Sequence, residues 1–177
     1  MDKQSFIEQI TTMQEPLRRF LLVLTHGDSD LADDLAQEAM LRAYLHCSTF
    51  EEQSALTTWI YRIAYNRYLD WQKSYWVQHR DGIDDSESAQ ALPADDAPDR
   101  AFLYEPLYRA IDALPPQEKA VVLLYYMDEK SLREIHAITN LSVGTITSHL
   151  FRARKRLKKM LTPPTPSRAP HVVLSGS

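Results

Sequence analysis

The stretch that decides the fold is SLREIHAITNLSVGTITSHLFRARKRLKKML, which runs from Ser131 to Leu161. Its first four residues end at Glu134 and form a capping box, in which the serine oxygen accepts a backbone amide hydrogen and the glutamate reaches back. Asn140 tolerates the left-handed backbone of a tight turn, and Ser142 can cap a further helix that runs toward Leu161. The pattern predicts two helices joined by a short turn, the arrangement called a helix-turn-helix.

The second predicted helix of this motif is amphipathic and strongly basic. Its apolar residues recur at three- and four-residue steps and predict an inward face made of Val143, Ile146, Leu150, Ala153, Leu157 and Met160. Residues 149–161 also contain six lysines and arginines and no acid. A solvated charged face on a purely structural helix is one explanation, but the capping box and the turn favour DNA binding.

In a helix-turn-helix, the second helix enters the DNA major groove. Polar residues near its start read base edges there, while lysines and arginines hold phosphates. This logic predicts base contacts by Thr145, Ser148 and Arg152. It predicts phosphate contacts by Lys155, Arg156 and Lys159.

The composition places this motif in an all-α chain of 177 residues. Only four glycines occur, while leucine, alanine, glutamate, glutamine and arginine are plentiful, which favours helices over turn-rich β structures. Cys47 is the only cysteine, so neither an internal disulfide nor a cysteine-based zinc site can form within one chain. The six histidines are scattered without a metal-binding pair, so we expect no metal, no cofactor and no enzymatic activity. No apolar run reaches the roughly 18 residues of a membrane span, and we predict a cytoplasmic protein without membrane insertion.

The chain divides into two predicted helical domains. Apolar residues at helical spacing indicate about four helices in residues 1–78 and a second small helical domain in residues 101–161. Residues 79–100 between them include seven acids, all within 81–99, and are predicted to be a flexible acidic linker. Residues 162–177 are rich in proline and are predicted to be a disordered tail. The net charge of −4 therefore hides a separation between an acidic linker and a basic final helix.

Four residues of the first domain share one predicted helical face because they lie three or four residues apart. They are Asp34, Gln37, Glu38 and Leu41, which set acids around an apolar centre. From the spacing alone, a solvated acidic face is the better explanation. Carboxylates can also serve in acid–base catalysis or metal binding, but no third ligand at helical spacing supports either role.

A second predicted helix, residues 57–73, mixes aromatic side chains with basic ones. Its aromatic residues include Trp59, Tyr61 and Tyr65, and its bases include Arg62 and Arg67. Aromatic rings stack on unpaired bases and basic side chains hold phosphates, so the combination suits a single nucleic-acid strand. Aromatic residues at helical spacing are also typical of a protein core, and we predict that role for Trp59.

Several segments resemble bacterial RNA polymerase sigma factors of the extracytoplasmic-function type. LPPQEKAV (114–121), SLREI (131–135), SVGTITS (142–148) and RARKRL (152–157) resemble region 4 of that family. DDLAQEAMLRAY (33–44) and TWIYRIAYNRYLD (58–70) resemble its region 2. The resemblance, in order and at family spacing, covers about residues 6–161.

The resemblance implies a sigma factor that binds core RNA polymerase and recognises two promoter elements. The face of Asp34, Gln37, Glu38 and Leu41 is then expected to dock on the polymerase. Region 2 is expected to capture the melted −10 strand through Phe50, Arg62, Asn66 and Arg67, and region 4 to bind the −35 element. The family also implies an anti-sigma factor as a partner.

The chain departs from the family pattern at a few positions. Glu51 and Glu52 follow Phe50 where a basic residue and a glycine are frequent, and acids there would repel phosphate. Thr147 and His149 stand where lysine and arginine are common. Two other functions stay open at this point, namely a stand-alone helix-turn-helix regulator of duplex DNA and a helical polymerase-binding adaptor.

Overall fold

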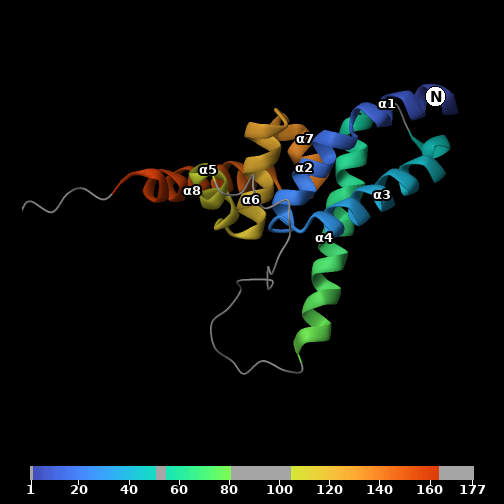
Figure 1. Cartoon of the computed structure of the whole chain (residues 1–177). Coiled ribbons are helices and arrows are strands. Elements are labelled where there is room, and N and C mark those ends of the chain that lie inside the picture. The colour runs from blue at the N-terminus through green and yellow to red at the C-terminus, as the bar shows by residue number, and fades with distance from the viewer. Residues whose placement is uncertain (1, 51–54, 81–104, 164–177) are drawn as a thin grey trace, which may run out of the picture.

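The computed structural model describes residues 2–50, 55–80 and 105–163 (Figure 1). All regular secondary structure in these residues is helical, as the composition predicts. Most of the predicted linker, nearly all of the predicted tail, and Glu51 and Glu52 lie outside the described residues.

The first half of the chain forms a helical bundle. It contains α1 (Lys3–Thr12), α2 (Gln14–Leu24), α3 (Ser29–Leu45), the short 3₁₀ helix η1 (Cys47–Thr49) and α4 (Leu56–His79). Asp2 and Asp28 cap α1 and α3 by accepting backbone amide hydrogens through their side chains. Buried side chains from α1 to α4 form the core of this bundle, with Phe6, Leu17, Leu21 and Ile60 among the most enclosed. α4 has 24 residues and continues six residues beyond the predicted end at Lys73.

The second half contains the predicted helix-turn-helix. Its elements are α5 (Pro106–Asp112), α6 (Pro116–Val122), the π-helical turn η4 (Leu123–Met127), α7 (Leu132–Thr139) and α8 (Val143–Leu161). The capping box of Ser131 and Glu134 forms with both of its hydrogen bonds. Asn140 takes the left-handed conformation at φ 62°, and the Ser142 side chain accepts the Thr145 amide hydrogen. These three predictions of local structure are confirmed.

The inward face predicted for α8 is correct only in its centre. Ile146, Leu150 and Ala153 are buried and Leu157 is half-buried, but Val143 and Met160 are 45% and 44% exposed. The reason is length. Measured at about 1.5 Å per residue, the 19-residue α8 is roughly 28 Å long, whereas its partners α5, α6 and α7 are short, so the two ends of α8 lie beyond their cover.

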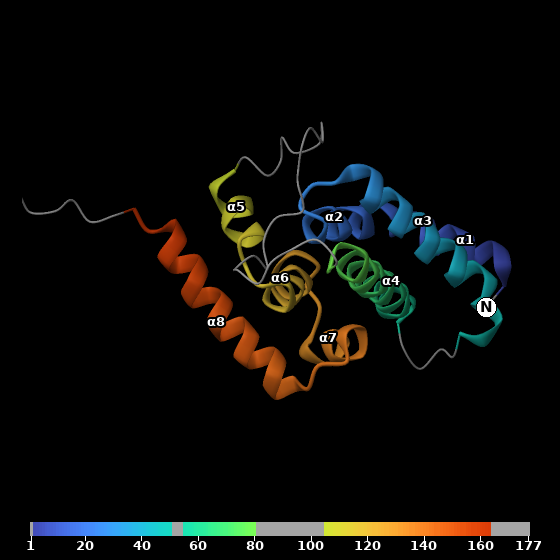
Figure 2. The same ribbon diagram turned by 90° about the horizontal axis from the view of Figure 1, so that it is seen from below.

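The two halves pack against each other, and α4 is the element they share. α2 and α3 pack on one side of α4 and α7 packs on another, while α6 also contacts α2 (Figure 2). Buried residues of both halves therefore join one continuous apolar cluster. A linker that lets two domains move apart was the expectation from sequence. That linker stays a prediction, and the described residues of the two halves adopt a closed arrangement.

The capping box makes a prediction for stability. The substitution Ser131→Ala removes the side-chain oxygen that accepts the backbone amide hydrogen of Glu134. We therefore expect the free energy of unfolding to fall by about 1 kcal/mol. Urea denaturation followed by circular dichroism measures this change. Ser74→Ala, an exposed position on α4, is the control and should change stability by less than about 0.5 kcal/mol. Equal effects of the two substitutions would contradict a capping role.

Candidate nucleic-acid and polymerase interfaces

The outer face of α8 presents the residues predicted to read bases. Thr145, Ser148 and Arg152 are all exposed. The Thr145 hydroxyl lies 2.8 Å from that of Ser142, so the capping residue also orients the first candidate base reader. Lys155 and Lys159 are exposed farther along the same helix. The face is therefore polar at its start and basic toward its end, as major-groove helices are.

Phe151 is a surface feature of α8 that the sequence reasoning missed. It is 68% exposed and lies one helical turn from both Ser148 and Lys155. An aromatic ring so open to water gains nothing from the core, whereas phenylalanine in a major groove can contact a thymine methyl group. Its spacing from Ser148 and Lys155 was the available signal in the sequence.

Two buried side chains, Glu118 and His149, contact the guanidinium group of Arg152. Its Nε donates to Oε1 of Glu118 at 3.3 Å, and a terminal nitrogen lies 3.0 Å from Nδ1 of His149. Arg156 places its Nε 3.2 Å from the other oxygen of Glu118. Burial, followed by the nearby charge of Arg152, lowers the pKa of His149, which favours the neutral ring that can accept a hydrogen bond from arginine.

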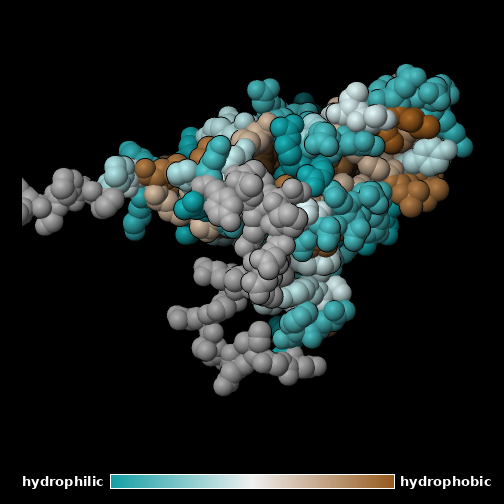
Figure 3. Space-filling view, viewed as in Figure 1, coloured by the Kyte–Doolittle hydropathy of each residue, from teal (hydrophilic) through white to brown (hydrophobic). Residues whose placement is uncertain are grey.

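The candidate polymerase face on α3 is open and has an apolar centre. Asp34 and Gln37 are exposed, and Leu41 is 57% exposed between them and the end of the helix. Tyr44 and Leu45 are exposed as well and extend the apolar area, although the sequence reasoning did not include them. In Figure 3, hydrophobic surface interrupts the hydrophilic one near the end of the molecule where α1 and α3 lie. An exposed apolar patch of this kind is typical of a docking surface.

Glu38 connects this face to α4. Its Oε1 lies 3.0 Å from Arg42 on its own helix and 3.0 Å from Nε of Arg67 on α4. Arg67 also pairs with Asp70 at 3.1 Å. The structure thus brings together a residue predicted to bind polymerase and one predicted to bind the −10 strand.

The other −10 candidates have different surroundings. Arg62 and Asn66 are exposed on α4, one helical turn apart. Phe50 is half-buried, and its ring packs against Trp59 with centroids 5.3 Å apart. The prediction that Trp59 belongs to the core is confirmed, since it packs on the buried cluster.

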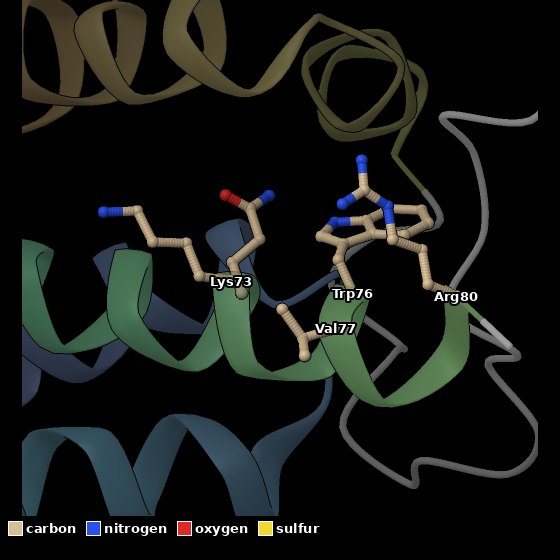
Figure 4. A pocket seen from close by; sticks show the side chains of 5 residues that line it. Lys73, Trp76, Val77 and Arg80 are labelled. Atoms are coloured by element: carbon tan, nitrogen blue, oxygen red, sulfur yellow. The ribbon is translucent and has the colours of Figure 1, made fainter.

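A series of aromatic side chains runs along α4 from the core of the bundle to the end of the helix. Neighbouring rings from Tyr65 through Tyr68, Trp71 and Tyr75 to His79 have centroids 4.0–6.3 Å apart. The end of this helix forms one wall of an open groove lined by Gln72, Lys73, Trp76, Val77 and Arg80 (Figure 4). Lys73, Trp76 and Arg80 project from the same side of α4. The cations of this groove, Lys73 and Arg80, and the exposed indole of Trp76 are suited to contact an anionic surface.

Comparison with known proteins identifies the family. Residues 10–77 match Sigma-70 region 2 and residues 104–157 match Sigma-70 region 4. The chain is 33% identical over 145 residues to the extracytoplasmic-function sigma factor SigW of Bacillus subtilis, covering 76% of this chain and 78% of that one. It is 35% identical over 156 residues to the sigma-E factor of Escherichia coli, covering 80% of each chain. The chain belongs to the extracytoplasmic-function sigma factors.

Solved structures extend the likeness to the fold. The sigma factor RpoE in its complex with the anti-sigma factor NepR from Bartonella quintana superposes with a TM-score of 0.73 at 26% identity, covering 92% of this chain and 99% of that one. CnrH in its complex with the cytosolic domain of CnrY gives a TM-score of 0.63 at 16% identity, covering 90% and 89%, and shares the fold.

This sigma factor therefore binds core RNA polymerase and directs promoter-specific initiation by recognising −10 and −35 elements. The stand-alone regulator and the adaptor that the sequence left open are not favoured. Within the described ranges, no group of histidine, cysteine and carboxylate side chains is placed to hold a metal ion. No described helix combines the length and the apolar character that crossing a membrane requires.

Polar contacts join region 2 to region 4 in the closed arrangement. His26, between α2 and α3, places Nδ1 2.7 Å from Asp112 of α5, and Lys119 of α6 donates to the same oxygen at 2.9 Å. Burial alone would raise the pKa of Asp112, but the His26 hydrogen bond and the Lys119 charge outweigh it and hold that pKa below its usual value.

A second set of contacts surrounds Tyr61 of α4. Its hydroxyl hydrogen-bonds with Asp128, and the Lys130 ammonium lies 5.1 Å from its ring centroid. Nearby, the Thr58 hydroxyl donates to Glu134 at 3.4 Å. Tyr61 is buried between the two regions, with its ring centroid 5.4 Å from that of Phe20 on α2 and Lys130 of region 4 above it.

Asp128 makes a prediction about pH. Burial raises the pKa of Asp128 to about 6, against the opposing effects of Tyr61, Lys130 and Arg19. The folded chain then prefers a protonated Asp128, and its contribution to stability is present at low pH and lost as the pH rises through 6. Asp128→Asn should increase the free energy of unfolding by about 2 kcal/mol at pH 8. Urea denaturation between pH 4 and pH 8 measures it.

The pH profile distinguishes this cause from a packing effect. The gain in the free energy of unfolding that Asp128→Asn produces should grow between pH 4 and pH 6 and stay constant above pH 6. Glu129→Gln, at the exposed neighbouring position, is the control and should give no gain that varies with pH. A gain of equal size at every pH would show that Asp128 does not titrate as described.

Proposed function

We propose that three separate surfaces of this sigma factor carry out promoter recognition. The α3 face docks on core polymerase, the exposed edge of α4 captures the melted −10 strand, and α8 reads the −35 duplex. The observation that carries the proposal is the outer face of α8, which is capped at its start, basic toward its end and free of acids. The chain supplies recognition and no catalytic group, because the polymerase performs the chemistry.

At the −35 element, Thr145, Ser148 and Arg152 contact base edges. Lys155, Arg156 and Lys159 contact phosphates. Phe151 lies among the base readers and supplies the apolar contact that distinguishes thymine from the other bases. The exposed positions of these side chains support the assignment.

At the −10 element, Arg62 and Asn66 contact the strand from the exposed side of α4. Arg67 reaches the same strand while it stays paired with Glu38. Phe50, packed on Trp59, forms the side of a pocket for a flipped base. The Glu38 pair supports a coupling between polymerase docking and strand capture.

The two regions must separate before both elements can be bound. The elements lie about 25 base pairs apart, as their names state, or roughly 85 Å at about 3.4 Å per base pair. In the closed form α8 follows α7 after three residues, and α7 packs on α4. Packed helices lie about 8–10 Å apart, so α8 is within roughly 20 Å of α4. The proposed residue ranges, with region 2 in 1–78, region 4 in 101–161 and a linker in 79–100, provide a tether for this opening.

An anti-sigma factor is the expected partner of the free chain. The RpoE structure is a complex with such a factor, and RpoE shares the fold over 92% of this chain. We propose that an anti-sigma factor binds this sigma factor in a related way and prevents its use by polymerase.

The docking surface can be tested by transcription. Leu41→Asp places a charge in the apolar centre of the α3 face without breaking an ion pair, so run-off transcription with purified core polymerase should fall more than tenfold. Leu107→Asp, an exposed apolar position on α5 of region 4, is the matched control and should stay near wild type. Arg152→Ala should lose or redirect initiation while polymerase binding persists. Full activity of Leu41→Asp would remove the α3 face from the proposal.

The opening can be tested by weakening the closed form. Combining His26→Ala with Lys130→Ala removes two contacts between the regions, so small-angle scattering of the free chain should show a larger radius of gyration. Initiation at limiting polymerase should rise severalfold, because less free energy is spent on opening. Gln4→Ala is the control, since the Gln4 side chain contacts Glu8 within α1 of region 2. A larger radius without any gain in initiation would mean that closure does not limit promoter use.

A further inference from the structure

Glu118 is a charged group in an unusual place. It lies on α6, faces α8 and is 3% exposed. Among the residues that the structure describes, it is the only carboxylate that is buried. Burying an ionised carboxylate costs free energy unless its partners offset the loss of water, so its presence requires an explanation.

The partners of Glu118 are two arginines of the recognition helix. Oε1 accepts from Nε of Arg152 at 3.3 Å, and Oε2 lies 3.2 Å from Nε of Arg156. The two arginines are four residues apart on α8, and their side chains are 50% and 55% exposed. One buried carboxylate is thus hydrogen-bonded to Nε of Arg152 and ion-paired with Nε of Arg156.

This anchoring leaves the outer nitrogens available. Nε is the guanidinium atom nearest the helix, so its use by Glu118 directs the terminal nitrogens toward solvent. His149 engages one terminal nitrogen of Arg152 at 3.0 Å and restricts rotation of the group further. Of the five N–H donors of Arg152, Glu118 and His149 occupy two, and the remaining terminal donors suffice for the two hydrogen bonds by which a guanidinium binds O6 and N7 of guanine.

We infer that Glu118 is a positioning residue for −35 recognition, which orients Arg152 toward a guanine and Arg156 toward a phosphate. The inference rests on the proposed contacts of α8 with the −35 duplex. Glu118 itself touches no DNA, since it lies beneath α8. It lowers the cost of binding by ordering two flexible side chains before DNA arrives.

A purely structural role fits the geometry less well. Oε2 is buried and has no hydrogen bond in the free protein, because Arg156 lies at ion-pair distance without hydrogen-bonding geometry. An apolar residue of similar volume would satisfy this packing, and such replacements of buried ion pairs are often neutral or stabilising. The exposed arginines do not need Glu118 for solvation. The arrangement therefore serves orientation better than it serves stability.

The test compares Glu118→Leu and Glu118→Gln with Arg152→Ala in the complex with core polymerase. Initiation is measured on promoters that carry every single base-pair substitution in the −35 element. Arg152→Ala should reduce the preference at one guanine position about tenfold. Glu118→Leu should reduce the preference at that same position, with a melting temperature equal to or above that of wild type. Glu118→Gln keeps an acceptor for Arg152 and should retain part of the preference.

The phosphate contact has a separate readout. Arg156→Ala should make the negative slope of log affinity for promoter DNA against log salt concentration less steep by about one. Glu118→Leu should also make this slope less steep. Glu129→Gln, an exposed acid of the same region, is the control and should change neither the preference nor the slope.

The outcomes separate this inference from the proposed function. If Arg152→Ala loses the base preference and Glu118→Leu keeps both preference and salt slope, Glu118 is structural and the inference is wrong. If Arg152→Ala leaves every base preference intact, the proposed contacts of α8 are themselves wrong. A Glu118→Leu protein that unfolds early while Glu118→Gln keeps full preference would likewise assign Glu118 to the fold alone.

Discussion

The burial of α4 on opposite sides is the constraint on which the rest of the structure depends. One side of the helix packs on α2 and α3 to complete region 2, and Thr58 and Tyr61 on another side meet region 4. Burial raises the pKa of Tyr65 and of Tyr68 to about 12, because an ionised hydroxyl would lose hydration there. The helix that is expected to hold a melted strand is therefore also the helix that closes the free molecule.

Three carboxylates have partly or fully lost their hydration in this structure. Asp112 and Asp128 lie where the two regions meet, and Glu118 lies under the recognition helix. Each is placed beside cationic or hydroxyl groups, which offset part of the desolvation cost. Interactions of this kind contribute little net stability, but they tolerate few alternative geometries. They fit the proposed opening, in which the regions are packed together in the free chain and apart on the promoter.

Local structure in the helix-turn-helix could be predicted because it depends on neighbours in sequence. The capping box of Ser131 and Glu134 and the left-handed Asn140 involve residues three or four positions apart, and both formed as expected. The exposure of Val143 and Met160 could not be predicted, because periodicity reports which face of a helix is apolar and not how far its partners extend. Phe151 was overlooked because an apolar residue is assigned to the core by default.

By itself, the sequence determined the all-α class, the two sigma regions and the polar and basic character of the outer face of α8, since these follow from helical period, caps and recognisable motifs. Only the tertiary structure decided which distant residues meet. His26 and Asp112 are 86 positions apart, and Glu118 and Arg152 are 34 apart. Contacts over such separations arise from the packing of whole helices, and no local pattern of residue types encodes them.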